Sequence, residues 1–197
     1  MVKKLPWLLA CLVGVAMGAV WPENQPHAAG SVGEIGADRL EVRASQGLVV
    51  LGRLPYTGVA LRHDEAGQLV ERTQYRHGKK HGLQEMWFAD GTPSFSSAYA
   101  LGKRDGETRS WWRNGNARTL SRFSDGRADG VQLQWYVSGA KFKEMRLRGG
   151  REVGMQRSWR ENGKLYNNYE VHDGRIYGLK RSKLCFRLDD EEIQLTQ

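Results

Sequence analysis

A spacing of 24 residues recurs through most of this chain and constrains its fold more than any other feature. Three glycine series and one tryptophan series follow this interval without an insertion or deletion. The first glycine series is Gly58, Gly82, Gly106, Gly130, Gly154 and Gly178, and the tryptophans are Trp87, Trp111, Trp135 and Trp159. A fixed period of this length indicates one supersecondary unit stacked on copies of itself.

Each period divides into two short runs separated by turns. The runs 107–112 and 117–123 flank Asn114-Gly115, a strong hairpin signal because both residues tolerate positive φ. A second reversal follows at 125–130, which contains two glycines. Two or more glycines per period leave no uninterrupted helical window. We therefore predict an all-β fold, an elongated antiparallel single sheet of β-hairpin repeats, with structural turns at Gly82, Gly106, Gly130, Gly154 and Gly178.

Alternation along the strands predicts which face of the sheet is buried. Val131, Leu133 and Trp135 share one face because residues two apart in a strand point the same way. We expect this face to hold the structural core, formed by Trp87, Trp111, Trp135 and Trp159 with the column Tyr75, Tyr99, Phe123, Leu147 and Val171. The opposite face is then mostly polar, with Gln132, Gln134 and Tyr136 in one repeat and Gln156, Ser158 and Arg160 in the next.

The pattern resembles the MORN family, and more closely its shorter bacterial variant, with the spacing G-x-x-x-G … W-[YFW]-x-[ND]-G. The residues that carry the resemblance are Gly102, Gly106, Trp111, Trp112, Asn114 and Gly115, with equivalents in the neighbouring repeats. The segment Pro55–Gly58 resembles the Pro-aromatic-Thr-Gly that often opens the first repeat. Such chains are often labelled YwqK-type antitoxins. The resemblance implies a non-catalytic hairpin array that binds other proteins or acidic lipid surfaces.

The first residues are typical of a targeting segment. Two lysines precede an apolar run from Leu5 to Val20, the order found in a secretory signal, and the run is short for a spanning helix. We interpret 1–20 as a signal peptide or membrane anchor, with lipidation at Cys11 as a minority alternative. This interpretation predicts export to the periplasm or cell envelope.

The remaining boundaries follow from composition. Residues 21–38 are expected to form a flexible spacer, 39–188 the repeat domain and 189–197 an acidic disordered tail. Within the repeat domain we expect a capping hairpin over 39–51 and six repeats over 52–188, because terminal units of repeat proteins are usually atypical. The segment 179–188 lacks the tryptophan and is expected to end the sheet as an edge strand.

Catalytic chemistry finds no support in the sequence. No nucleophile elbow, phosphate-binding loop or paired-carboxylate pattern occurs, so we predict a protein that is not an enzyme and has no cofactor. The neighbouring lysines argue against a metal at His77 and His81. Cys185 is expected to be a small apolar residue, and a redox or metal accessory role for it is the weaker alternative.

Charge gives the sharpest functional signal. The chain has a formal net charge of +8, and residues 52–187 hold 26 Lys/Arg against 14 Asp/Glu. One cation per repeat follows a turn glycine: Lys79, Lys103, Arg127, Arg151 and Arg175. These five could bind an anionic surface or simply keep the protein soluble. The second aromatic of each pair, at Phe88, Trp112 and Tyr136, predicts an exposed interaction face.

These features predict an exported scaffold that binds a protein partner or an anionic lipid or envelope polymer. Nucleic acid is a less probable partner for an exported chain, and membrane association could be peripheral or anchored. The alternative from another class is an antitoxin-like protein that neutralises a partner toxin.

Overall fold

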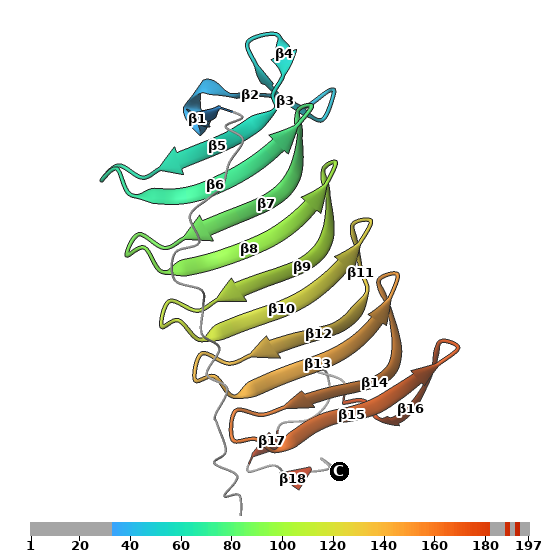
Figure 1. The fold of residues 1–197 in the computed structure, drawn as a ribbon. Helices are drawn as coiled ribbons and strands as arrows, with labels where there is room; N and C mark the ends of the chain where they lie inside the picture. Colours follow the sequence, from blue (N-terminus) through green and yellow to red (C-terminus); the bar gives the residue numbers. More distant parts are fainter. Residues whose placement is uncertain (1–32, 182–187, 190–191, 194–197) are drawn as a thin grey trace, which may run out of the picture. The chain divides into compact units, whose positions relative to one another are not determined.

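The computed structural model describes residues 33–181, 188–189 and 192–193. The described part is almost entirely β-structure, with one short 3₁₀ helix, η1 (Ala37–Arg39), and no α-helix. Its main feature is a long antiparallel sheet of consecutive hairpin strands that does not close into a barrel (Figure 1). The predicted fold class is therefore confirmed. No helix within these ranges is long and apolar enough to cross a lipid bilayer.

The main sheet contains thirteen strands, and from β5 onward each pairs with its neighbours in chain order. The first half comprises β1 (Glu34–Gly36), β5 (Gly58–His63), β6 (Leu69–Arg76), β7 (Lys79–Trp87), β8 (Pro93–Ala100) and β9 (Lys103–Trp111). The second half comprises β10 (Ala117–Ser124), β11 (Arg127–Ala128), β12 (Gly130–Trp135), β13 (Lys141–Arg148), β14 (Arg151–Trp159), β15 (Leu165–His172) and β16 (Arg175–Leu179). Residues 188–189 and 192–193 form the short pair β17 (Leu188–Asp189) and β18 (Glu192–Ile193).

The first strand of the main sheet is the one exception to antiparallel pairing. β1 runs parallel to β5, with Ile35 opposite Ala60. The buried Tyr56 side chain ties these strands, because its hydroxyl lies 2.8 Å from the carbonyl oxygen of Gly33 and 3.0 Å from that of Val59. Residues 34–39 are thus part of the fold, whereas we expected 21–38 to form a flexible spacer. A parallel pairing has no local sequence signal, because its partner lies more than twenty residues away.

The segment before the repeats forms a separate three-stranded sheet, the cap. It consists of β2 (Glu41–Arg43), β3 (Leu48–Leu51) and β4 (Leu54–Pro55), and it adds a strand to the hairpin that we expected over 39–51. The cap contacts the first repeat through backbone hydrogen bonds: Val49 donates to the carbonyl oxygen of Gly78 over 2.8 Å. Val50, at 1% exposure, is the most buried apolar residue of the described chain.

The turns at the two ends of the strands differ. Each row of turns forms one long side of the main sheet, and these two sides are called its edges below. At one edge the strands are joined by two-residue turns in which both residues have positive φ, such as Asp125 (48°) and Gly126 (80°). These values define type I′ turns, which match the right-handed twist of the strands. At the other edge, the carbonyl oxygen of Trp112 accepts from Gly115 and its N–H donates to Asn116, while Asn114 does not have positive φ. The Asn-Gly pair therefore forms a longer loop and not the two-residue turn that its residues suggested.

The glycines that we assigned to turns lie inside strands. Gly82, Gly106, Gly154 and Gly178 lie within β7, β9, β14 and β16, and Gly130 begins β12. All have positive φ, and the pairing register shifts around them, as between Thr73 and Tyr75 on the strand beside Gly82. These are β-bulges, which bend a strand and increase its twist. Figure 1 shows the strands curving toward the edge that carries the two-residue turns.

On β7 and β12 the buried face is the opposite of the one we predicted, whereas Val171 of the predicted column on β15 is buried at 7% exposure. Val131 and Leu83 are 40% and 42% exposed, whereas Gln132 and Gln156 are only 4% and 1% exposed. The register shifts just before Trp87 and Trp135 explain the error, because a one-residue slip separates each tryptophan from the residues that alternation placed on its face. The bulges at the glycines also create a need for polar groups: the Gln156 amide nitrogen donates to the carbonyl oxygens of Arg146 (2.9 Å) and Val153 (3.0 Å).

The large side chains that we predicted for the core on β8, β10 and β13 lie opposite the glycines of the bulges. Tyr99 is opposite Gly82, Phe123 opposite Gly106 and Leu147 opposite Gly130. Rings and glycines thus share the face that carries the buried glutamines. A side chain on these glycines would meet neighbours other than the rings, such as Gln74 beside Gly82 and Ala98 beside Gly106.

Several predictions fall on residues that the structure does not describe. The targeting segment 1–20, Cys11, Cys185 and most of the acidic tail lie outside the described ranges. The last strand of the main sheet, β16, ends at Leu179, so the edge strand expected over 179–188 is not observed in the described part of that segment, and Lys180 and Arg181 follow it. The Lys180 ammonium lies over the Tyr169 ring and 3.5 Å from a Glu152 carboxylate oxygen.

Candidate functional site

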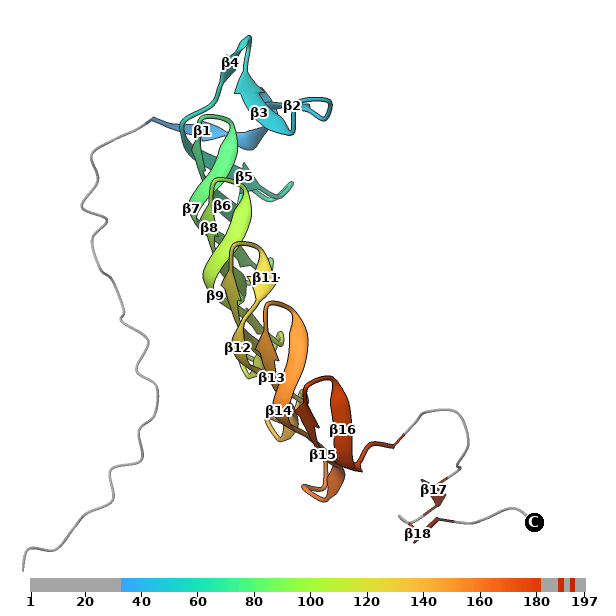
Figure 2. The ribbon, with the colours of Figure 1, turned by 90° about the vertical axis from the view of Figure 1, so that its right-hand side faces the viewer.

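The two-residue turns stack on one another along one edge of the sheet. The N–H of Gly102 donates to the carbonyl oxygen of Lys80 over 2.7 Å, which joins the second turn to the first. The same bond links Gly126 to Arg104 and Gly150 to Ala128, each over 2.8 Å. Because the bonds recur at the repeat period, the turns are held in register. Figure 2 shows the sheet from this edge.

Nine cationic residues occupy these turns, and we call this edge the basic edge. Taking five residues at each turn, from 76–80 to 172–176, the basic edge holds Arg76, Lys79, Lys80, Lys103, Arg104, Arg127, Arg148, Arg151 and Arg175. The same residues include three carboxylates, Asp125, Glu152 and Asp173. The net charge of the basic edge is therefore +6.

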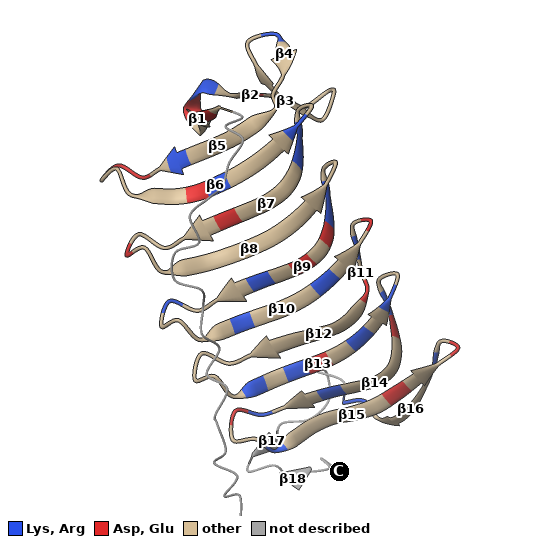
Figure 3. Cartoon of the chain, in the orientation of Figure 1, with Lys and Arg blue, Asp and Glu red and all other residues tan. Residues whose placement is uncertain are grey.

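The opposite edge of the sheet lacks this excess. The equivalent five-residue segments, from 64–68 to 160–164, hold three cations and four carboxylates. Figure 3 shows the difference, with blue at the right-hand turns and red at several of the left-hand loops. The two edges of the sheet thus differ in charge, and the edge with the two-residue turns is the positive one.

The five cations predicted from the sequence all lie on the basic edge and are exposed: Lys79, Lys103, Arg127, Arg151 and Arg175. They are not equally available. The Lys103 ammonium lies 2.6 Å from a carboxylate oxygen of Asp125 in the next turn. This hydrogen bond, with the charge of Lys103, lowers the pKa of Asp125. Since both side chains are more than half exposed, the pair is worth little to stability.

Two further cations of the basic edge point along the face of the sheet and were missed in the sequence. The Lys80 ammonium lies 5.2 Å from the centre of the Tyr99 ring and donates to Gln84 over 2.8 Å. The Arg104 guanidinium lies 5.3 Å from the centre of the Phe123 ring. Each residue is the second of its strand, and 80 and 104 are one period apart. That recurrence could have identified them as partners of the aromatic column.

The aromatic residues expected to form an exposed face serve a different purpose. Phe88, Trp112 and Tyr136 are half-buried at the starts of the loops. The Trp112 indole N–H donates to the carbonyl oxygen of Trp135 over 3.2 Å, and the Tyr136 hydroxyl donates to that of Trp159 over 3.0 Å. Each bond spans 23 residues and joins one repeat to the next. The exposed interaction face predicted at these positions is therefore wrong, because the side chains hold neighbouring repeats together.

The tryptophan column lies beside these bonds. Trp87, Trp111, Trp135 and Trp159 end their strands and are half-buried, and none of them is fully enclosed. The pairing register shifts immediately before Trp87, Trp135 and Trp159. A single layer of sheet leaves even its largest side chains partly open to water.

Polar side chains form the most enclosed part of the middle repeats. The hydroxyls of Ser97 and Thr108 lie 2.6 Å apart and are almost fully buried. Gln84, Gln132 and Gln156 occupy the position of Thr108 in other repeats, and they are buried too. Gln84 donates over 2.7 Å to Glu71, which also accepts two hydrogen bonds from Arg62. Burial opposes ionisation of Glu71, but these hydrogen bonds outweigh it and lower its pKa.

No group of three or more His, Cys, Asp and Glu side chains within the described ranges is placed to hold a metal ion. His81, which we had weighed as a ligand, accepts a hydrogen bond from the backbone of Leu101 through its Nδ1 atom. The candidate site of the described chain is therefore an extended charged edge.

Comparison with known proteins does not assign this chain to a family. No protein-family model matches the chain, and no curated protein matches it. The resemblance to the MORN variants therefore rests on the residues alone.

Proposed function

We propose that this chain is a non-catalytic repeat scaffold that binds an anionic surface through its basic edge. The supporting observation is the row of five exposed cations, one per repeat, on turns of which the first four are joined by hydrogen bonds at the repeat period. The opposite edge, built from the same repeats, has no such row. A charge pattern needed only for solubility would not have to favour one edge.

The spacing of the row suits a surface better than a small ligand. One cation per two strands gives a separation of about 10 Å. Electrostatic attraction is screened over about 8 Å at physiological salt, so each cation acts on its own stretch of the surface. A cation near an anionic membrane is worth about 1 kcal/mol. Five in a line therefore give useful binding only to a partner that presents many negative charges together.

Vesicle sedimentation tests this proposal. The full chain should pellet with vesicles that contain anionic phospholipid and remain in solution with phosphatidylcholine vesicles. Binding should weaken as salt is raised from 50 to 500 mM, since screening shortens the reach of each charge, to about 3 Å at 1 M. Replacing Lys79, Lys103, Arg127, Arg151 and Arg175 with Gln should remove binding and leave the β-type circular dichroism spectrum unchanged.

A matched control variant tests whether vesicle binding depends on the position of the cations or only on the total charge. Replacing Arg53, Arg113, Arg122, Arg146 and Arg157 with Gln removes the same charge from exposed residues outside the five turns. We expect this variant to keep most of its vesicle binding. Equal loss in both variants would mean that only net charge matters, and full binding by the first variant would exclude the basic edge.

Export and an envelope location belong to the same proposal and rest on the sequence of residues 1–20. An anionic lipid surface is available to an exported protein that remains near the membrane. Cell fractionation tests this part. Recovery of the chain in the cytosol would favour the antitoxin-like alternative.

A further inference from the structure

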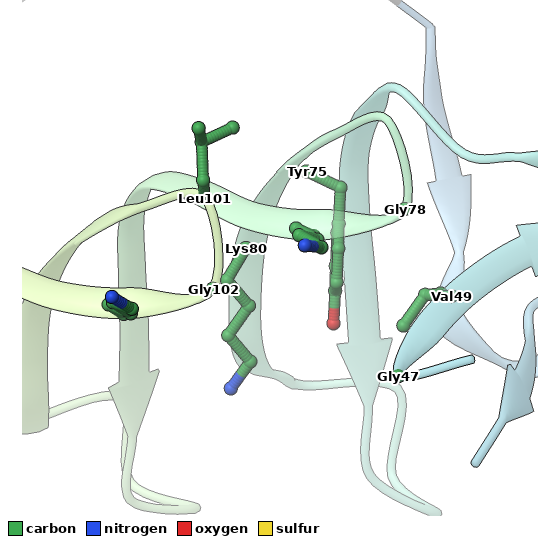
Figure 4. Close-up of a pocket in the computed structure, with 9 residues that line it drawn as sticks. Gly47, Val49, Tyr75, Gly78, Lys80, Leu101 and Gly102 are labelled. Atoms are coloured by element: carbon green, nitrogen blue, oxygen red, sulfur yellow. The ribbon is translucent and has the colours of Figure 1, made fainter. Parts of the chain in front are cut away.

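A cavity of about 350 Å³ lies where the cap meets the first two turns of the basic edge (Figure 4). Val49 of β3 and Leu101 of the second turn contribute apolar walls. Lys79, Lys80 and Lys103 also line the cavity, and no acidic residue does. A volume of this size is at the small end of ligand pockets in proteins. The cap has no counterpart among the later repeats, so the other turns of the described chain do not share this arrangement.

Several hydrogen-bond donors in the cavity are not used by the protein. An ammonium group has three N–H donors. Lys80 uses one on Gln84 and Lys103 one on Asp125, while the Lys79 ammonium has no partner among the described residues. The Tyr75 hydroxyl likewise makes no hydrogen bond within the described ranges, and Figure 4 shows it pointing to the same side as the Lys80 side chain.

The Lys80 ammonium group is already held in place by the protein before any ligand binds. It is held between the Gln84 side chain and the Tyr99 ring. The aliphatic stem of Lys79 passes beside Gly102 of the next turn, while its ammonium group has no partner among the described residues. Positioned donors lose less conformational entropy when they bind a ligand.

We propose that this cavity binds a phosphate group, carried by a lipid headgroup or by a small soluble molecule. A phosphate presents more oxygens than a carboxylate and can accept from several lysines and a phenol at once. The planar pairing that favours carboxylates needs an arginine, and none lines the cavity. The inference deepens the proposed function and rests on it, because Lys79 and Lys103 belong to the basic edge.

Leu101 offers a substitution that acts on the cavity and suits the backbone. It has a φ of 48°, and Asp125 and Asp173 occupy the equivalent turn position with φ of 48° and 47°. Asp125 pairs with Lys103 of the preceding turn, so the change Leu101→Asp should place a carboxylate beside Lys79 in the same way. Leu101→Asn has the same shape without the charge. Gly149→Asp puts an equal charge at the equivalent position of a later turn, away from the cavity.

Calorimetric titration of the full chain with glycerol 3-phosphate tests the proposal, with glycerol as the uncharged control. We expect saturable binding of glycerol 3-phosphate only. Leu101→Asp should weaken it about tenfold or more, the value of one charge-assisted hydrogen bond. Leu101→Asn and Gly149→Asp should stay within about threefold of the parent. The absence of saturable binding, or an equal loss in Gly149→Asp, would overturn the proposal.

Vesicle sedimentation of the same proteins keeps the two proposals distinguishable. If anionic vesicles bind and glycerol 3-phosphate does not, the cavity proposal fails and the basic edge stands. If glycerol 3-phosphate binds and vesicles do not, the cavity stands and surface binding fails. Competition by glycerol 3-phosphate against phosphatidic acid vesicles would identify the lipid headgroup as the source of the phosphate. Saturable binding without competition would identify a soluble molecule.

Discussion

The glutamine buried beside the bulge of β14 gives the most specific test of the fold. The Gln156 side chain is 1% exposed, and its amide nitrogen donates to the carbonyl oxygens of Arg146 at 2.9 Å and Val153 at 3.0 Å. Its amide oxygen accepts from the Arg146 N–H over 3.3 Å. We expect Gln156→Met, which keeps the length of the side chain, to lower the free energy of unfolding.

The magnitude follows from the groups left without partners. Each hydrogen bond contributes about 1 kcal/mol, and a buried polar group left unpaired costs about 1–3 kcal/mol. With two carbonyl oxygens losing close partners, the expected loss is about 2–4 kcal/mol. Gln132 makes a longer bond of 3.1 Å to the carbonyl oxygen of Arg122, so Gln132→Met should cost less.

Gln134 provides the matched control. It lies two residues after Gln132 on β12, is half-buried, and makes no side-chain hydrogen bond within the described ranges. Gln134→Met should change stability by less than about 0.5 kcal/mol. Urea unfolding followed by tryptophan fluorescence measures all three variants. Equal stabilities of the Gln156 and Gln134 variants would refute the argument that these amides satisfy the bulges.

Three other predictions concern separate features. Gly130→Val should cost about 1–3 kcal/mol in urea unfolding, because Gly130 has a φ of 91° that a β-branched residue does not hold; a change below about 0.5 kcal/mol would contradict this. Trp112→Phe should cost about 1 kcal/mol by removing the indole N–H donated to Trp135, and an unchanged midpoint would mean that this bond does not join the repeats. Because the folded pKa of Glu71 is lowered, its contribution is present above the unfolded value near 4.5 and is lost as pH falls through the folded value. Melting temperatures between pH 3 and pH 7 should therefore fall less steeply in Glu71→Gln than in the parent, and parallel curves would contradict this.

The basic edge shows how a repeat converts a local signal into an extended surface. A cation after a turn glycine has little meaning in one repeat. Hydrogen bonds such as that from Gly102 to Lys80 place the next cation one repeat further along the same edge. The recurrence of 24 residues therefore sets the position of each charge, and the proposed binding depends on their number.

The sequence alone determined the repeat, the all-β class and the residues of the cationic row. These follow from local chemistry, since glycine recurs where φ is positive and strands alternate with turns. Alternation failed where it was extended across a bulge. The register shift between Gln134 and Trp135 interrupts the parity count, so Val131 lies toward solvent and Gln132 is buried.

Only the tertiary structure decided what depends on contacts between repeats and between distant segments. The bond from Trp112 to Trp135, the parallel pairing of β1 with β5, and the cavity between Val49 and Lys79 join residues about 20 to 30 positions apart. Such contacts are set by the twist and register of the whole sheet, which no short segment specifies. A periodic sequence fixes what each repeat is, and the stacking of the repeats fixes which of its side chains remain free to bind.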